Sequence, residues 1–410
     1  MMEASASSVA KIDWTPTRAA GLARQSAFLP RAGRAYASMR NSDFGPEDRA
    51  NISCLSPWVR HRLIEEPALL VEVLDQHSAS SAEKFIQEVY WRAYFKGWLE
   101  QRPTVWSAYL DDLERLQDDW SHTAAYLDAI QGRTGLECFD AWAVELVDHG
   151  YLHNHTRMWF ASIWIFTLRL PWQLGADFFF KHLMDADPAS NTLSWRWVGG
   201  LHTKGKTYLA RPDNIARFTD GRFSPRPGDL AKNAPPLDEA IEHPRRALPD
   251  LAAPSPTGRV GLLLTKEDGS PESLSLPKAP VATLALTSVA TRTRTGIGRV
   301  AKHFTEGALA DASARAEAFF GCPTRQLETQ DWRGALTEWI DDNQLDSIVT
   351  AAPAVGPTAT RLRAAFENAI GVPLIELRRP YDAAAWPHAS RGFFGLKKKI
   401  PALLEDAVTL

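Results

Sequence analysis

Apolar residues recur every three or four positions over long segments in the first half of the chain. The clearest segments are 82–101, 138–153 and 157–170, and they contain few β-branched residues. A period of three to four residues places the apolar side chains on one face of a helix. The first half is therefore predicted to be an all-α domain.

The second half follows a different pattern. Short apolar runs, each the length of a strand, alternate there with helical stretches at 301–320 and 358–370. The runs are 260–265, 281–287, 345–350 and 372–376. This alternation predicts a smaller α/β domain with a parallel, Rossmann-like sheet.

A proline-rich stretch separates the two patterns. Eight prolines fall among polar residues between positions 225 and 256, which is typical of a linker. At 410 residues, the chain is long enough for two domains. We expect a helical domain over 1–226, a linker over 227–257 and the α/β domain over 258–410, with no internal repeat.

Composition narrows the class of protein. With 45% hydrophobic and 23% charged residues and a formal net charge of -3, the chain is typical of a soluble globular protein. Cys54, Cys138 and Cys322 are too few and too far apart for a disulfide framework, a four-cysteine zinc site or an iron–sulfur cluster. We therefore expect a cytoplasmic protein without a bound metal.

Neither a signal peptide nor a membrane helix is expected. The first residues contain no apolar core, and the longest apolar run, 158–168, is well short of the roughly 20 residues that a membrane helix needs.

The unusual feature of the composition is its 15 tryptophans, of which 12 precede residue 198. The first half therefore has a particular use for indole side chains.

Two predicted helices combine polar and aromatic groups on one face. Glu88, Trp91 and Arg92 have the spacing i, i+3 and i+4, which places them on one face of a helix. Asn154, Arg157 and Met158 have the same spacing. Such faces suit a site that binds a polar ligand. The alternative is an ordinary amphipathic helix whose charged residues face water.

A third segment places polar residues at helical spacing. Asp187, Asn191 and Trp195 lie at i, i+4 and i+8, and Trp197 follows. A buried carboxylate needs a partner, and we expect Arg157 to pair with Asp185. Asp187 alone is also consistent with a carboxylate that caps a helix.

Two further segments could bind phosphate. Ser53 and Ser56 precede Pro57, where hydroxyl and backbone N–H groups at a helix start could hold a diphosphate, although such caps are common. The segment 204–226 contains six basic residues and two acidic ones. It could contact a polyanion, or it could be a solvated loop.

Five spaced segments together resemble the FAD-binding helical domain of the DNA photolyase and cryptochrome family. The resemblance covers about residues 30 to 225. The segments are AYASMRNSDFGPEDRANISCLSPW, FIQEVYWRAYF, TGLECFDAWAVELVDHGYLHNHTRM, ASIWIFTLRLPW and MDADPASNTLSWRW.

The resemblance implies a U-shaped FAD. Arg92 and Arg157 would lie near the flavin, Asp187 would approach the ring edge, and Asn191 would face flavin N5, with Asp185 paired to Arg157. The phosphate side would be held by Tyr36, Ser53, Leu55 and Ser56. Where the family has a threonine in this loop, this chain has Ile52, which removes one hydroxyl contact.

The family's electron-transfer chain of three tryptophans also has counterparts. Trp195 would lie beside the flavin, and Trp172 would be the middle member. Trp120 matches the outer member when a single-residue gap is allowed. An excited flavin can oxidise an indole, so a series of short hops would connect the cofactor to the surface.

Family members that repair cyclobutane pyrimidine dimers surround the flipped lesion with five residues that match here, namely Glu88, Trp91, Asn154, Met158 and Trp197. Aromatic side chains can stack on an extruded base while a carboxyl group binds its edge. Family members that act on 6-4 photoproducts carry a His-His pair at the positions that correspond to His153 and Asn154, so Asn154 argues against that activity. The expected partner is DNA containing pyrimidine dimers, contacted by Lys204, Lys206, Arg211 and Arg217.

The order of domains departs from the family. Its members carry an α/β antenna domain before the helical domain, whereas here the α/β domain follows, as a circular permutation would give. It resembles the antenna domain weakly, and the antenna chromophore is left unassigned. A monomer is the expected state.

Three functions are compatible with these features. The first is a light-driven photolyase, and the second is a cryptochrome-type blue-light photoreceptor with the same flavin and tryptophans. The third is a flavoprotein that keeps the fold without either role.

Overall fold

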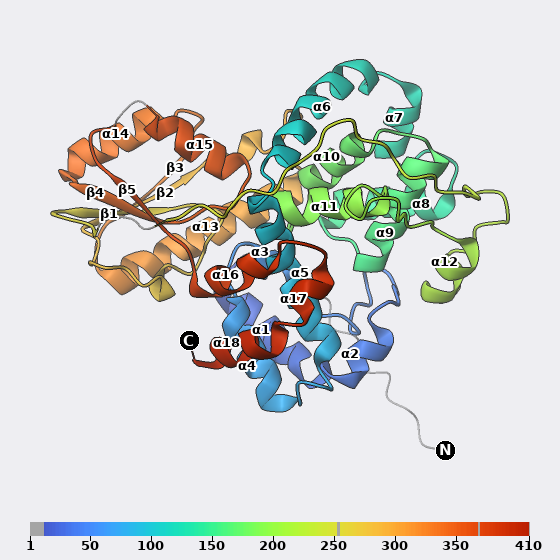
Figure 1. Cartoon of the computed structure of the whole chain (residues 1–410), viewed down its shortest axis with the longest axis horizontal. Coiled ribbons are helices and arrows are strands. Elements are labelled where there is room, and N and C mark those ends of the chain that lie inside the picture. The colour runs from blue at the N-terminus through green and yellow to red at the C-terminus, as the bar shows by residue number, and fades with distance from the viewer. Residues whose placement is uncertain (1–11, 252–254, 368–369, 410) are drawn as a thin grey trace.

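A parallel β-sheet covered by helices lies beside a larger helical body (Figure 1). The computed structural model describes residues 12–251, 255–367 and 370–409. The long helix α13 (Arg299–Phe320) belongs to the sheet layer and packs against α1, α8 and α10 of the helical body. The fold class expected from the sequence is confirmed.

The helical body begins at α1, and local signals mark the start of α1 and the end of α8. The Thr17 side chain accepts a hydrogen bond at the start of α1, and Gly150 ends α8 in a left-handed conformation with φ of 63°. None of the helices described is long and apolar enough to cross a membrane. The helices are α1 (Arg18–Phe28), α2 (Arg34–Met39), α3 (Ser56–Arg60), α4 (Glu66–Gln76), α5 (Glu83–Glu100), α6 (Thr104–Trp120), α7 (Ala124–Ile130), α8 (Glu137–His149), α9 (Asn154–Ser162), α10 (Trp172–His182), α11 (Pro188–Val198) and α12 (Pro212–Phe218).

The segment predicted as one helix over 157–170 is not regular. Helix α9 ends at Ser162 and continues as a π-helix over Ile163–Thr167, in which Leu168 N donates to Ile163 O. Ile163, Trp164, Ile165 and Phe166 are consecutive and all buried. Four adjacent buried side chains point in all directions from a helix, so other elements surround this turn on every side.

All strands of the sheet are parallel, in the order β3-β2-β1-β4-β5. The central strand β1 is buried along its whole length, as a strand covered on both faces should be. The edge strand β3 was not expected from the sequence, because its residues are mostly polar whereas the other strands carry apolar runs. The strands are β1 (Val260–Leu264), β2 (Ala282–Thr287), β3 (Thr324–Glu328), β4 (Ser347–Ala351) and β5 (Leu374–Leu377).

Helices cover both faces of this sheet. Leu262 and Leu264 pack with residues of α13, whereas Leu263 packs with α14 (Trp332–Asn343) and α15 (Pro357–Phe366). Alternate residues of a strand point to opposite faces, so the run VGLLL supplies both cores.

The proline-rich stretch is held against the helical body. Leu237 N donates to Gly199 O at 2.9 Å, and Glu239 pairs with the buried Arg196 at 2.5 Å. From Thr219 to Arg259, the described residues contain no helix or strand. The expected linker over 227–257 therefore follows the surface of α11 for part of its length.

The last helices return to the helical body. α16 (Pro380–Ala385), α17 (Phe393–Lys397) and α18 (Ile400–Thr409) pack against α4 or α5. Their buried residues, including Trp386, Phe393 and Leu396, belong to the same apolar core as the first helices. The boundaries drawn from the sequence stay a prediction, but the segment after β5 contributes to the core of the helical body.

Candidate functional site

The loop before α11 carries two buried carboxylates. Asp187 caps α11, because its side chain accepts from Ser190 N at 2.8 Å and Pro188 occupies the first turn. Arg92 of α5 forms an ion pair with the same carboxylate. Asp187 therefore serves as a helix cap and also joins α11 to α5.

Asp185 forms the ion pair expected from the sequence. Arg157 Nη2 lies 2.9 Å from Asp185 Oδ2, and the Ser56 hydroxyl donates to the same oxygen. Burial by itself would raise the pKa of Asp185, but Arg157 and these hydrogen bonds hold it below its usual range. Residues from α3, α9 and the loop before α11 thus meet at one carboxylate.

The loop before α3 has an unusual backbone. Cys54 adopts a left-handed conformation with φ of 56°, and the next residue, Leu55, is right-handed. Alternation of this kind turns successive N–H groups toward one side and favours anion binding. Arg24 fixes the loop by donating to Ser53 O and Ile52 O, both at 2.7 Å.

The expected FAD-binding residues are mostly buried and fit a polar, anionic cofactor. Among the described residues, Asp185 Oδ1, Ser190 Oγ, Thr192 Oγ1 and Trp195 Nε1 are buried without a hydrogen-bond partner. Buried polar atoms are normally paired, so this concentration along residues 185–195 suits a bound ligand. Tyr36 is buried against Phe28 and Phe85, outside this group.

The side-chain amide of Asn191 is already held by a hydrogen bond. Its Nδ2 donates to Ala176 O at 2.8 Å, which fixes the side chain between α11 and α10. The carboxamide oxygen remains the atom through which Asn191 could contact a ligand. The expected position facing flavin N5 stays a prediction.

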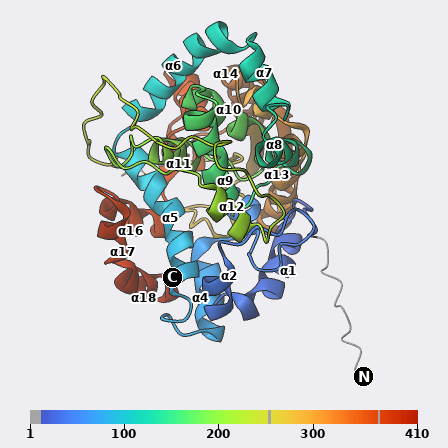
Figure 2. The ribbon, with the colours of Figure 1, turned by 90° about the vertical axis from the view of Figure 1, so that its right-hand side faces the viewer.

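The five residues matched to a lesion pocket share one property: each retains exposed surface. Glu88, Trp91, Met158 and Trp197 are half-buried and Asn154 is exposed. They lie on α5, α9 and α11, and α11 packs against both other helices. Figure 2 faces the side of the molecule on which these helices come together.

Two of these five have partners that the sequence did not reveal. Glu88 forms an ion pair with Arg40, which follows α2. The Trp91 indole stacks on Phe393 of α17, with ring centroids 3.8 Å apart and planes 10° apart. One face of Trp91 is therefore covered by the C-terminal segment.

The solvent exposure of the three tryptophans matched to an electron-transfer chain rises from Trp195 through Trp172 to Trp120. Trp195 is 2% exposed and Trp172 is 7% exposed, whereas Trp120, the last residue of α6, is half-buried. Helix α10, which carries Trp172, packs against both α11 and α6. The Tyr109 ring lies 5.6 Å from Trp172, so a phenol is also in contact with this series.

The expected DNA-contacting residues are all on the surface. Lys204, Lys206, Arg211 and Arg217 are exposed. Arg222 of the same stretch instead pairs with the buried Asp43 at 3.1 Å, which gives it a structural role.

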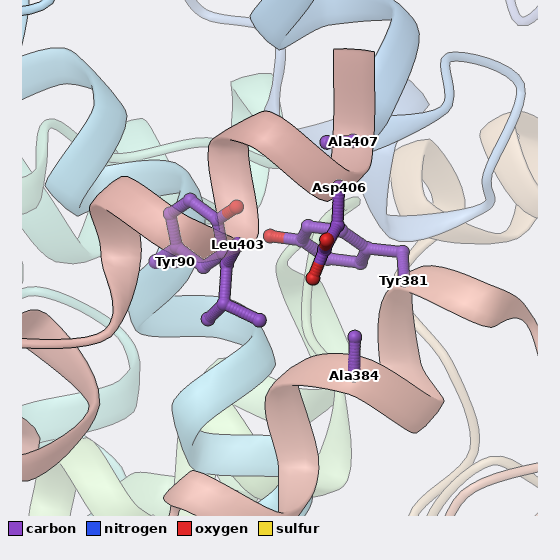
Figure 3. A pocket seen from close by; sticks show the side chains of 6 residues that line it. All are labelled: Tyr90, Tyr381, Ala384, Leu403, Asp406 and Ala407. Atoms are coloured by element: carbon purple, nitrogen blue, oxygen red, sulfur yellow. The ribbon is translucent and has the colours of Figure 1, made fainter. Parts of the chain in front are cut away.

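A small cavity lies away from these groups. Tyr90, Tyr381 and Asp406 help to line a volume of ≈ 10 Å³ between α5 and the C-terminal helices (Figure 3). The two phenol oxygens point into it, and neither has a hydrogen-bond partner in the part of the chain that the structure describes. This volume suits a single water molecule rather than a cofactor.

Sequence reasoning missed Arg24, Arg40 and Phe393. They lie 29, 48 and 302 positions from Ser53, Glu88 and Trp91, the residues that they contact. Phe393 and the basic residues after it carried a local signal, since FFGLKKK combines adjacent aromatic residues with a lysine run.

The helical body, with its buried ion pairs and several buried polar atoms left without a partner, fits a domain that binds an anionic cofactor. The family model described as the FAD binding domain of DNA photolyase matches residues 85–225. Through this segment, the chain resembles the DNA photolyase and cryptochrome family, and the match supports FAD as its cofactor.

Relatives match over part of their length. The chain is 31% identical over 194 residues to a deoxyribodipyrimidine photo-lyase of Agrobacterium fabrum, covering 46% of this chain and 39% of the relative. It is 31% identical over 254 residues to one of Thermus thermophilus, covering 58% of this chain and 57% of the relative. The chain therefore spans less than two thirds of the length of these relatives.

Two solved structures are similar over about half of the chain. One is a bacterial class III photolyase from Agrobacterium tumefaciens, with 26% identity, a TM-score of 0.41, and coverage of 51% of this chain and 48% of that one. The other is a cryptochrome from Synechocystis, with 23% identity, the same TM-score, and coverage of 50% and 43%.

Proposed function

We propose that this protein repairs cyclobutane pyrimidine dimers in DNA in a light-dependent reaction. The observation that carries the proposal is the set of a carboxylate, an amide, a thioether and two indoles with exposed surface on α5, α9 and α11. Two of these helices, α5 and α9, also supply Arg92 and Arg157 to the ion pairs with Asp187 and Asp185, and all five residues lie within the segment that matches the FAD-binding model. The named relatives in this family are photo-lyases, which agrees with the proposal.

The side chains of this rim would hold a dimer outside the duplex. Trp197 would stack on a base, and Trp91 would do so with the face that Phe393 leaves open. Burial raises the pKa of Glu88 while the ion pair with Arg40 opposes the shift, and this carboxyl group would bind the edge of a flipped base. Asn154 and Met158 would complete the wall.

The buried charges would hold the cofactor. Ser53, Leu55 and Ser56 would contact its phosphates, and Arg92 and Arg157, each already paired with an aspartate, would lie near its ring system. When bound, excited reduced FAD would supply the electron that splits the cyclobutane ring. The buried Trp195 would pass electrons inward from Trp172 and Trp120. No chromophore is assigned to the α/β domain.

A cryptochrome-type photoreceptor is the second candidate. The stacking of Phe393 on Trp91 favours it, because a segment of the chain itself then occupies one wall of the pocket. A receptor would need the flavin and the tryptophans but no room for a dimer.

Repair can be tested directly. The reduced holoprotein would be illuminated with single-stranded DNA containing thymine dimers, and the recovery of thymine absorbance would be followed, with a dark sample as the control. Recovery in the light alone supports the proposal. A protein that cycles its flavin under blue light and leaves the dimers intact would be a photoreceptor instead.

A further inference from the structure

The helix α17 is anchored beside the rim that carries Glu88 and Trp91. Phe393 stacks on Trp91, and Leu396 of the same helix is fully buried. The Tyr94 hydroxyl donates to Arg391 O at 2.9 Å, and Arg102 donates to Ser390 O at 2.8 Å. The backbone of this segment is thus held in place by α5 and the residues after it.

The outer side of the same segment is basic and aromatic. Phe394 is 76% exposed, and Arg391, Lys398 and Lys399 are exposed around it. Over residues 12–251, 255–367 and 370–409, no carboxylate forms an ion pair with any of these three cations, whereas Lys397 pairs with Glu83. The sequence has no acidic residue from 383 to 404.

This basic segment continues the basic strip of residues 204–226. The Tyr94 hydroxyl contacts the Arg391 carbonyl and also lies 3.0 Å from His202 Nε2, just before Lys204. In Figure 2, α17 lies on one side of α5 and α12 lies on the other. Exposed cations therefore flank α5 on both sides.

Exposed cations on the same short segment as an exposed aromatic ring suit the binding of a nucleic-acid strand. Lysine and arginine neutralise phosphates, and aromatic side chains stack on unpaired bases of any sequence. A membrane surface is disfavoured because α17 has five residues, and interfacial helices need a long apolar face. The acidic balance of the whole chain makes the local excess of positive charge more distinctive.

We propose that residues 391–399 form a second nucleic-acid-binding surface, in which Arg391, Lys398 and Lys399 contact phosphates and Phe394 stacks on an unpaired base. The strand would pass from this surface across α5 to the strip at Lys204. The inference deepens the proposed function and rests on its DNA-binding part. It does not depend on repair, since an undamaged strand has the same phosphates and bases.

The test measures binding of the full-length holoprotein to a labelled, undamaged single-stranded oligonucleotide in the dark, by fluorescence anisotropy at several salt concentrations. For Lys398→Gln/Lys399→Gln, we expect weaker binding to all sequences and a salt dependence shallower by about 1.4 in log–log slope, at about 0.7 per phosphate. For Phe394→Ala, we expect affinity to fall about five- to hundredfold.

The controls are matched in chemistry and lie in the α/β domain. Phe319→Ala removes another exposed aromatic ring, and Lys278→Gln/Lys302→Gln removes two other cations. Neither should change affinity by more than about twofold. All the substituted side chains are at least partly exposed, and circular dichroism would verify that each variant folds.

Distinct results separate this inference from the proposed function. Unchanged affinity and slope in both 394 and 398/399 variants would overturn the inference even if wild-type protein repairs dimers. Loss of binding in these variants would support it even if wild-type protein repairs nothing. Binding to vesicles with anionic headgroups but not to oligonucleotides would overturn it in favour of a membrane contact.

Discussion

Removing the positive partner of Asp185 should destabilise the protein strongly. Asp185 is 3% exposed, and its carboxylate interacts with Arg157 and with the Ser56 hydroxyl. Breaking a buried ion pair by deleting one member typically costs about 3 to 5 kcal/mol, since the other charge stays buried. The Ser56 hydrogen bond remains, so we expect about 3 kcal/mol for Arg157→Met.

The opposite deletion should cost less. The Arg157 side chain is 24% exposed, so water can solvate its charge after Asp185→Asn, and we expect about 1 to 2 kcal/mol. The double variant replaces both charges with neutral groups. Its cost should be lower than the sum of the single costs by at least about 1 kcal/mol, as for residues in direct contact.

Urea unfolding of the wild type, the two single variants and the double variant, with and without added FAD, measures these free-energy costs. The pKa of Asp185 is lowered in the folded protein, so its contribution is present above the unfolded pKa and is lost as pH falls through the folded value. The single variants should also retain less FAD after dialysis. Additive costs, within about 0.3 kcal/mol, would refute the reasoning that the two charges stabilise one another.

Two further outcomes follow from the site, and a third follows from Asp177, a buried residue of α10 that accepts a hydrogen bond from Gln117. Trp195→Phe should abolish photoreduction of oxidised FAD by an external reductant but leave repair by chemically reduced protein intact; photoreduction at the wild-type rate would mean that the electron chain is assigned wrongly. Glu88→Ala should lower the repair yield per photon more than it lowers lesion binding. Trp197→Ala should instead weaken lesion binding by roughly 1 to 3 kcal/mol. If quantum-yield and binding assays gave the reverse order, these roles would be wrong. Burial raises the pKa of Asp177 from 3.8 to about 7, so the folded state binds an extra proton and stability should fall as pH rises from about 4 to about 7. Asp177→Asn should remove this slope and stabilise the protein above pH 7 by up to about 4 kcal/mol in thermal or urea unfolding, and an unchanged pH profile would contradict the raised pKa.

Local periodicity predicted several long helical segments and the central strands, and the cost of an unpaired buried charge predicted one contact. The run VGLLL is apolar on both faces and predicted a strand covered on both sides, as β1 is. The spacing of Asn154, Arg157 and Met158 and the presence of a nearby buried carboxylate predicted the Arg157–Asp185 pair. The strand depends on neighbouring residues, whereas the Arg157–Asp185 pair joins residues 28 positions apart and was predicted from the general cost of an unpaired buried charge.

Only the tertiary structure decided how distant segments meet. The edge strand β3 is polar and forms because β2 offers it a free edge, and the π-helix at Ile163–Thr167 forms where other elements surround four buried side chains. The stacking of Phe393 on Trp91 and the pairing of Arg40 with Glu88 join residues that no helical or strand period relates. Such contacts depend on the packing of whole elements around a common core, and a local pattern shows which face is buried but not which segment will cover it.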